Sequence, residues 1–342
     1  MNKRIWWSVG AVLLAAVLVY ALAGVGCDYP GFKLRTQTWL AGETRLFDAG
    51  APGFFYAPWS LAVFVPLSFL PDRIASTLMN TASLACILLS IQLLVGRAPW
   101  WVVVVAVSNI YTANLLGANQ WDAYILAAIA VGWWAIQNEK PVLLGLALAV
   151  VGTKPTNALL PALLLLSEVV VRRWSWRRWV AVLIIPVECL LASFLISGLD
   201  WPWRYVHFVR LAGPNAGYNV TFWRSTTALE GLLELATIVA SVTTLGWVIN
   251  RRGIDGVTLS LALLVNLIFS PYATIYHYVI VIPLIVWLGL QDSLWLVWVY
   301  AASAAWVLIR EPFLPLFPAA LALAVLVVQV QRQRRTVLEA TV

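Results

Sequence analysis

Charged side chains are scarce in this sequence. Aspartate, glutamate, lysine and arginine together make up 11% of its 342 residues, whereas 62% of the residues are hydrophobic. In soluble domains about a quarter of the residues are charged, because a compact globule must present a polar surface to water. A chain of this length with so few charges cannot cover such a surface, which excludes a soluble globular protein.

Cysteine and histidine are also rare. The three cysteines, Cys27, Cys86 and Cys189, form no CxxC motif, and the two histidines, His207 and His277, stand far apart. This pattern predicts neither a disulfide framework nor a metal site, and no loop gathers the carboxylates that a divalent ion prefers. The P-loop, GxSxG and HExxH motifs are absent as well. We therefore expect no metal and no cofactor.

Long apolar runs recur along the whole chain. Residues 11–25, AVLLAAVLVYALAGV, are one example, and the mean hydropathy is +0.86. A helix needs about 20 apolar residues to cross a hydrocarbon core, whereas a transmembrane β-barrel shows short alternating segments. The sequence therefore predicts an all-α polytopic integral membrane protein with about twelve transmembrane helices, forming one domain over residues 1–342. The predicted spans are 5–25, 54–71, 75–95, 99–116, 120–137, 141–171, 179–198, 228–249, 256–271, 275–291, 293–309 and 313–331.

The run 141–171 is too long for one straight crossing. Lys154 and Pro155 interrupt it, and proline removes a backbone donor and clashes with the preceding turn. We expect one broken crossing here, with two short half-helices as the alternative.

Twelve crossings place both termini on the same side of the membrane. The loops on that side hold more basic residues than the opposite loops, which indicates a plasma-membrane protein with cytoplasmic termini. These basic loops account for the net charge of +7, so no nucleic-acid partner is expected. The inside loops hold Lys3, Arg4, Arg73, Arg172, Arg173, Arg177, Arg178, Arg251, Arg252, Arg332, Arg334 and Arg335; the outside loops hold Lys33, Arg35, Arg45, Arg97, Lys140, Arg204, Arg210, Arg224 and Arg310.

Two predicted outer loops, 26–53 and 199–227, are long enough to carry short amphipathic helices. In the second loop Arg204, His207 and Arg210 recur every three residues, which places them on one face of a helix. Such a basic face suits a phosphate, a lipid headgroup or a sugar, although ordinary surface residues show the same pattern.

Three ionisable residues lie at or within apolar runs, where charge is costly and often functional. Asp28 follows the first span and is a candidate general base, with a helix cap or a solvated flanking charge as the alternative. His277 lies between two spans and suits charge pairing, phosphate binding or proton transfer, or only a backbone hydrogen bond. Lys154 lies inside a span and must face a cavity, a partner or an anionic ligand, unless it extends to an interface.

Gln120 and Asp122 form another polar break between spans, in the segment LLGANQWDAYI. A carboxylate in such a position is expected to be buried and paired. The sequence alone does not identify the partner of Asp122.

Several short motifs follow one another in the order typical of one enzyme family. They are Asp28-Tyr29 before a segment ending Trp39-Leu40-Ala41-Gly42, Phe55-Tyr56-Ala57-Pro58, Gly117 with Gln120 and Asp122, Gly145 with Lys154-Pro155, and Ser270-Pro271 with His277-Tyr278 and Pro283. This succession resembles the GT-C-type polyprenyl-phosphate-dependent glycosyltransferases, specifically glycosyltransferase family 87, which includes bacterial α-mannosyltransferases. The sequence departs from the family pattern where Ala57 replaces a proline and Asp122 an asparagine.

The resemblance implies a GT-C-like fold and transfer of a hexose, by expectation mannose, from a polyprenyl-phosphate-sugar to a glycolipid or cell-envelope glycan at the outer face. Membrane lipids, the lipid-linked sugar and the acceptor would be its partners. Asp28 would deprotonate the acceptor hydroxyl, and His277 would position or charge-balance the reacting groups. The candidate donor- and acceptor-binding residues are Tyr29, Lys33, Arg35, Tyr56, Gln120, Lys154, Arg204, His207, Arg210 and Tyr278.

Two other classes of function remain open at this point. A transporter or flippase of lipid-linked substrates needs paired polar residues along a path through the spans, for which Lys154 and Asp122 are the candidates. A non-catalytic membrane scaffold needs neither Asp28 nor His277. An enzyme predicts that Asp28 and His277 converge on one outer cavity.

Overall fold

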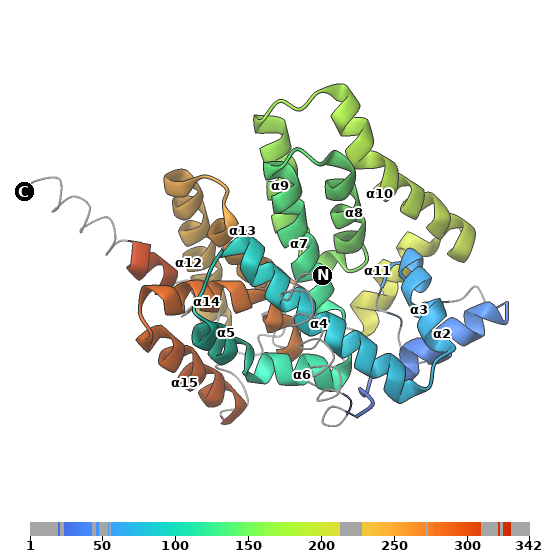
Figure 1. Cartoon of the computed structure of the whole chain (residues 1–342), viewed down its shortest axis with the longest axis horizontal. Helices are drawn as coiled ribbons and strands as arrows, with labels where there is room; N and C mark the ends of the chain where they lie inside the picture. The colour runs from blue at the N-terminus through green and yellow to red at the C-terminus, as the bar shows by residue number, and fades with distance from the viewer. Residues whose placement is uncertain are drawn as a thin grey trace, which may run out of the picture.

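The structure is a computed structural model that describes residues 20, 24–42, 46–47, 54, 56–212, 228–270, 273–308, 321 and 324–329. These residues form helices joined by turns, with no β-strand among them (Figure 1). Most of the predicted spans 5–25 and 313–331 lies outside the described residues. The elements are α2 (Tyr29–Leu40), η1 (Pro58–Ser60), α3 (Leu61–Ser68), α4 (Asp72–Leu94), α5 (Trp100–Val107), α6 (Ile110–Ala118), α7 (Asp122–Gln137), α8 (Pro141–Gly152), η2 (Pro155–Asn157), α9 (Leu159–Val171), α10 (Trp176–Ser197), α11 (Trp201–Ala212), α12 (Ala228–Arg252), α13 (Gly256–Phe269), η4 (Ile275–Val281), α14 (Ile282–Gln291) and α15 (Leu294–Leu308).

The predicted count of twelve crossings is not confirmed. Within the described residues, α4 and α10 are long and apolar enough to cross a membrane, and α5 with α6 adds a third crossing if this pair, bent by 60°, is one span. Most other predicted runs form apolar helices of 10–17 residues, shorter than the roughly 20 that a straight crossing needs. The all-helical class is confirmed, but the runs are divided more often than hydropathy indicates.

The predicted single crossing at 141–171 is wrong, and the alternative of two short helices is confirmed. Gly132 of α7 faces both Leu144 of α8 and Leu165 of α9. At the start of α7, Asp122 binds both Lys154 and Asn157, which lie between these two helices. After α7 the chain therefore runs back along it as α8, reverses at Lys154–Asn157 and returns as α9.

The assignment of loops to opposite sides also fails for residues 54–71. Lys33, predicted outside, forms a 2.6 Å ion pair with Asp72, which precedes the predicted inside residue Arg73. The Tyr29 hydroxyl likewise donates to the Leu67 carbonyl at 2.8 Å. The physical reason is the length of α3, whose 8 residues extend only about 12 Å, so the chain returns to the end it left.

Two further contacts correct the sides of the later loops. Arg178, predicted inside, pairs at 2.7 Å with Glu139, which precedes the predicted outside residue Lys140. The α-carbon of Gly256 lies against the backbone of Leu94 at the end of α4. Because α4 and α7 both begin at the opposite end, where Tyr124 donates to the Met79 carbonyl, both helices end on this side.

The bundle therefore has two distinct ends. The site end comprises residues 26–33, 67–72, 119–122, 154–157 and 274–277, and the basic end comprises residues 95–99, 138–140, 172–178 and 251–255. The corrected assignment places Arg97 and Lys140 beside the basic residues of 172–178 and 251–252. The excess of lysine and arginine at the basic end over the site end is therefore larger than the loop assignment from the sequence predicted.

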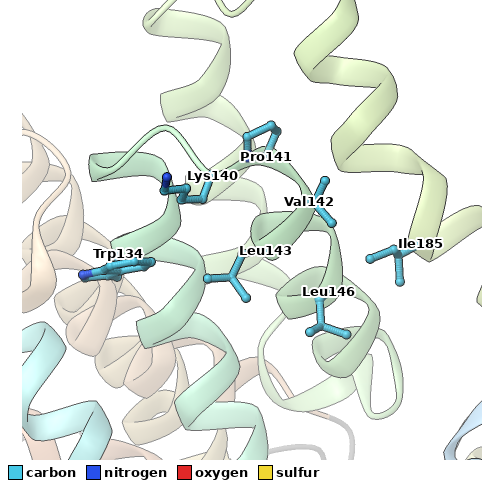
Figure 2. Close-up of a pocket in the computed structure, with 7 residues that line it drawn as sticks. All are labelled: Trp134, Lys140, Pro141, Val142, Leu143, Leu146 and Ile185. Atoms are coloured by element: carbon cyan, nitrogen blue, oxygen red, sulfur yellow. The ribbon is translucent and has the colours of Figure 1, made fainter.

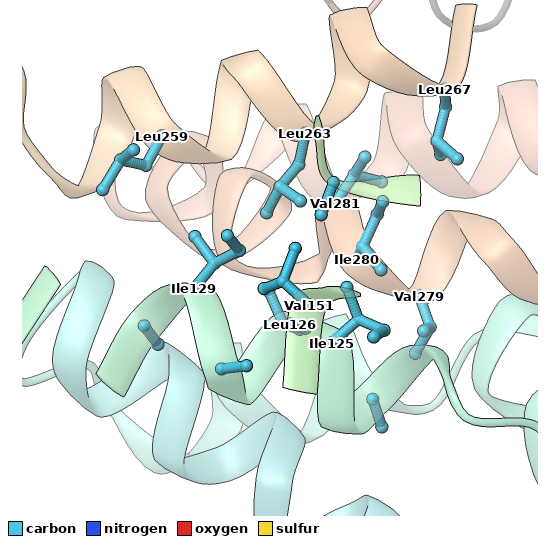
Figure 3. Close-up of a cluster of buried hydrophobic side chains, with 14 of the residues drawn as sticks. Ile125, Leu126, Ile129, Val151, Leu259, Leu263, Leu267, Val279, Ile280 and Val281 are labelled. Atoms are coloured by element: carbon cyan, nitrogen blue, oxygen red, sulfur yellow. The ribbon is translucent and has the colours of Figure 1, made fainter. Parts of the chain in front are cut away.

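The centre of the bundle is an apolar contact between α7, α13 and η4 (Figure 3). Its members are buried side chains from all three elements and from α8, including Ile125, Leu126, Ile129, Val151, Leu259, Leu263, Leu267, Val279, Ile280 and Val281. Outside this core, α10 exposes large apolar side chains, with Leu195 at 90% and Leu191 at 57% of their surface. Exposed apolar surface of this extent is stable against lipid rather than water.

The helices expected in the two outer loops are present as α2 and α11. In α11 the side chains of Trp201, Tyr205 and Phe208 are buried on one face, while His207 is exposed, as an amphipathic helix requires. In contrast, α2 is not amphipathic, because Arg35 is buried and Leu34 is exposed.

Replacing Gly256 by alanine is expected to destabilise the protein by about 1–3 kcal/mol. A β-carbon at this position would lie 1.9 Å from the Leu94 carbonyl oxygen, and this neighbour is backbone that cannot rotate away. Gly246→Ala is the matched control, because nothing lies within 4 Å of its β-carbon position. Thermal unfolding in detergent should show a lower midpoint for Gly256→Ala and an unchanged or slightly higher one for Gly246→Ala. Equal midpoints would contradict the close contact of α4 and α13.

Candidate active site

Asp28 lies at the N-cap position of α2 and is half-buried. Its carboxylate makes no capping hydrogen bond to the helix, although this is the usual role of an aspartate there. Instead, it accepts a hydrogen bond from the Gln120 amide, and the Cys27 thiol lies 3.6 Å from its other oxygen. The carboxylate is thus held by Gln120 and Cys27 rather than by its own helix.

The segment that carries Asp28 is fixed by Asn119, which follows α6. Asn119 has a left-handed backbone, with φ of 56°, and its side chain accepts from the Gly26 amide at 2.8 Å. Its amide group donates in turn to Asn80 of α4 at 2.7 Å. A β-carbon on Gly26 would lie 2.0 Å from the Asn119 side chain, so only glycine fits. Neither Asn119 nor Gly26 was among the site residues predicted from the sequence.

Gln120 connects Asp28 to a cluster of aromatic rings. Its carbonyl oxygen accepts from the Tyr56 hydroxyl at 2.9 Å, while its amide holds Asp28. The Tyr56 ring packs against Phe64 and Trp121 at centroid distances of 5.8 Å and 6.0 Å. This packing fixes Tyr56, and through Gln120 it fixes the orientation of the Asp28 carboxylate.

A fully buried charge cluster lies two residues beyond Gln120. Asp122 is 0% exposed, and Lys154, 2% exposed, places its ammonium 3.1 Å from the Asp122 carboxylate. Asn157 donates a hydrogen bond to the same carboxylate. The Lys154 ammonium also lies over the rings of Tyr56 at 5.6 Å and Tyr276 at 5.5 Å, a cation–π arrangement. Lys154 is therefore the partner of Asp122 that the sequence did not reveal.

His277 lies beside this charge cluster. The Thr274 amide donates to its Nδ1 at 2.8 Å, so in the neutral ring the proton is on Nε2. Nε2 lies 3.8 Å from the Asp122 carboxylate. Thr274 and His277 also form a capping box at the start of η4, which fixes the ring orientation.

The predicted residues thus divide into two groups. Five of them, from elements far apart in the sequence, form one connected network at the site end: Asp28, Tyr56, Gln120, Lys154 and His277. Asp122 joins the two halves of this network, because it pairs with Lys154 and lies beside His277.

The other predicted binding residues have separate contacts. Lys33 pairs with Asp72, and Arg204 pairs with Asp200 at 3.0 Å. His207 is exposed on α11. The predicted binding residue Arg210 belongs to α11, but its side chain lies outside the described residues.

Three further predicted residues are buried in packing contacts. The Tyr29 hydroxyl donates to the Leu67 carbonyl, and burial together with the charge of Asp72 raises the pKa of Tyr29 to about 12. The Tyr278 ring packs against Tyr111 at 5.7 Å. Arg35 is buried on α2.

Alkylation of Cys27 is expected to obstruct the Asp28 carboxylate, because the thiol lies 3.6 Å from it. Partial burial of the otherwise exposed Cys27, with the Asp28 charge adding to it, raises the pKa of its thiol. The reactive thiolate is therefore depleted at pH 7–8, and the rate of inactivation by N-ethylmaleimide should still rise above pH 9. Cys27→Ser should retain activity and resist the reagent. Inactivation of Cys27→Ser at the same rate would assign the effect to Cys86 or Cys189.

Comparison with protein families gives a match between residues 54–332 and the model of glycosyltransferase family 87. This range contains Tyr56, Gln120, Lys154 and His277 and begins after Asp28. Comparison with curated proteins gives no significant match. Among solved structures, the chain is similar to the crystal structure of ArnT from Cupriavidus metallidurans bound to undecaprenyl phosphate. The identity is 17%, the match covers 94% of this chain and 75% of that chain, and the TM-score is 0.49.

Proposed function

The chain belongs to glycosyltransferase family 87, and we propose that this membrane glycosyltransferase uses a polyprenyl-phosphate-sugar as its donor. It transfers the hexose of this donor, which we propose to be mannose, to a lipid-linked or cell-envelope glycan. One observation carries the proposal beyond the family. The Asp28 carboxylate makes no capping hydrogen bond to its own helix. Gln120 holds it next to the buried network of Asp122, Lys154 and His277. A single oriented carboxylate of this kind suits a general base.

In the proposed reaction, the acceptor hydroxyl gives its proton to the Asp28 carboxylate as its oxygen attacks C1 of the sugar. The bond between C1 and the phosphate oxygen breaks, and its electron pair leaves with the polyprenyl phosphate. A phosphate leaving group needs no protonation by a strong acid, so one carboxylate suffices. Direct displacement by the acceptor inverts the configuration at C1.

Lys154 is assigned a positioning role rather than direct contact with the donor phosphate. Its ammonium is almost fully buried and is already paired with Asp122. A buried charge is tolerated only when it is paired and hydrogen-bonded, so this pair holds α7 against the turn between α8 and α9. We place the donor phosphate toward α11, where His207 is exposed and the helix packs beside Trp59 of η1.

A transporter is supported less well than an enzyme. The charged groups from Asp28 to His277 gather at the site end, whereas the contact of α7, α13 and η4 is apolar (Figure 3). A flippase needs polar groups along a continuous path for its headgroup. The buried pair of Asp122 and Lys154 is accounted for by its contacts within the site.

The test of this function is a comparison of sugar donors with the purified protein in vesicles. We expect labelled mannose to pass from polyprenyl-phosphate-mannose to an extracted glycolipid acceptor, with release of polyprenyl phosphate and inversion at C1. A nucleotide sugar should not serve as the donor. Transfer from a nucleotide sugar alone would overturn the proposed donor. A correctly folded protein that transfers from neither donor, but moves labelled lipid between leaflets, would establish the transporter instead.

We propose that the protein is multi-pass, with the site end on the outer face, because the basic end carries the excess of lysine and arginine. A membrane-impermeant maleimide should label Cys27 in intact cells, since its thiol is exposed at the site end. In a Cys27→Ser background, a cysteine introduced at Lys140 should be labelled only after permeabilisation. The opposite pattern would place the site in the cytoplasm.

A further inference from the structure

A groove crosses the outward face of α8 at the basic end of the bundle (Figure 2). Its volume is about 440 Å³, and its lining is almost entirely apolar. Trp134 of α7 and Lys140 lie along one side, Leu143 and Leu146 of α8 form the floor, and Ile185 of α10 lies opposite. The volume falls within the range of about 300–1,000 Å³ that is typical of ligand pockets.

The groove exists because α8 and α10 pack closely around Gly145 and then separate. At Gly145, a β-carbon would lie 2.4 Å from the Val182 carbonyl oxygen, so the two backbones are in contact there. Beyond this contact α10 runs obliquely away from α8 (Figure 1). Ile185 follows Val182 by one turn of α10 and faces Leu146 across the resulting gap (Figure 2).

The groove presents apolar surface to its surroundings. Val142 is 54% exposed, Leu146 48% and Trp134 39%. Apolar area of this kind favours contact with hydrocarbon, and an indole ring prefers the boundary between acyl chains and headgroups. These features fit an acyl chain that lies along α8, with Trp134 at its polar end.

A positive charge lies where the headgroup of such a lipid would be. Lys140 is exposed, and no acidic side chain of the described residues lies within ion-pair distance of it. Its neighbour Glu139 is paired with Arg178, and Glu168 is paired with Arg172. The charge of Lys140 is therefore available to an anion, and the nearby segment 172–178 adds further positive charge.

We propose that this groove is a binding site for an anionic phospholipid, with the phosphate at Lys140 and one acyl chain across Leu143 and Leu146 to Ile185. The site is separate from the Asp28 network. Asp122 begins α7 and Lys140 follows the end of that helix of 16 residues, so the two sites lie about 24 Å apart along its axis. The charge of the basic end selects a phospholipid with a net negative headgroup over a zwitterionic one.

The full chain in phosphatidylcholine vesicles with a small fraction of photoreactive phosphatidylglycerol provides the test. After illumination, we expect cross-linked lipid on peptides that contain residues 134–146 and 185. Lys140→Gln, which removes the charge, and Leu146→Trp, which fills the groove, should each lower the cross-link yield at least fivefold. Lys140→Arg should retain the yield, and Arg97→Gln is the matched control, because Arg97 is an exposed cation of the basic end that does not line the groove.

Three results would overturn the proposal. The first is an unchanged yield in both Lys140→Gln and Leu146→Trp. The second is equal capture of photoreactive phosphatidylcholine, which would make the groove a site for any acyl chain. The third is loss of the cross-link on addition of polyprenyl phosphate at equal concentration, which would assign the groove to the substrate lipid. Unchanged unfolding midpoints in detergent verify that the variants are folded.

Discussion

Asp28→Asn is expected to lower sugar transfer by about 10²–10⁴-fold, the contribution typical of a general base. Asparagine keeps the size and planarity of the side chain but cannot accept a proton from the acceptor hydroxyl. Because the Asp28 carboxylate makes no capping hydrogen bond in α2, its loss should leave the helix intact. The measurement is the rate of labelled sugar transfer at saturating donor, together with the unfolding midpoint of each protein in detergent.

Asp72→Asn is the matched control for this substitution. Asp72 is also an aspartate at the start of a helix of the site end, but it forms a partly exposed pair with Lys33. Pairs of this kind contribute little to stability, so transfer and unfolding should both stay close to wild type. If Asp28→Asn retained wild-type turnover, Asp28 would not be the base. Equal losses in both variants would indicate a general effect of charge at this end.

Lys154→Met is expected to destabilise the protein by about 3–5 kcal/mol, because it leaves the Asp122 carboxylate buried without its cation. Asp122 is 0% exposed, so water cannot replace the ammonium that lies 3.1 Å away. The measurement is the unfolding midpoint in detergent. The double variant Asp122→Asn with Lys154→Met removes both charges and should recover most of the loss.

The double variant distinguishes charge pairing from packing. If Lys154 stabilises the protein only through its methylenes and its contacts with Tyr56 and Tyr276, the two substitutions should add. Recovery in the double variant would establish the ion pair as the dominant contact between α7 and the turn at 154–157. Additive losses would contradict this account.

The sequence predicted the positions of the helices better than their directions. Within the described residues, hydropathy located the helical segments to within a few residues, since apolar runs of this length have one stable structure in lipid. Hydropathy placed residues 141–171 in one crossing, because the hydropathy of an apolar run does not indicate where the chain reverses. The reversal at Lys154–Asn157 depends on hydrogen bonds to Asp122, more than 30 positions earlier in the chain.

The candidate site was predicted in part for the same reason. Asp28 and His277 are conspicuous in the sequence because an ionisable group beside an apolar run is costly, and the structure connects both to one network. Asn119 and Asn157 are neutral and common in turns, so their residue type gave no signal. Lys33 and Arg204 were expected at the site on charge alone, but acidic residues nearby pair with them.

The reversal between α8 and α9 also has a consequence for biosynthesis. Helices of 12 and 13 residues are each too short to cross the bilayer alone, so the hairpin must enter the membrane as one unit with Lys154 at its tip. The cation has no partner within the hairpin, and Asp122 on the preceding helix neutralises it. We expect α7 to be in place before the hairpin is inserted. Loss of Asp122 would then appear first as a failure of membrane integration, and as degradation of the nascent protein, before any effect on sugar transfer is measured.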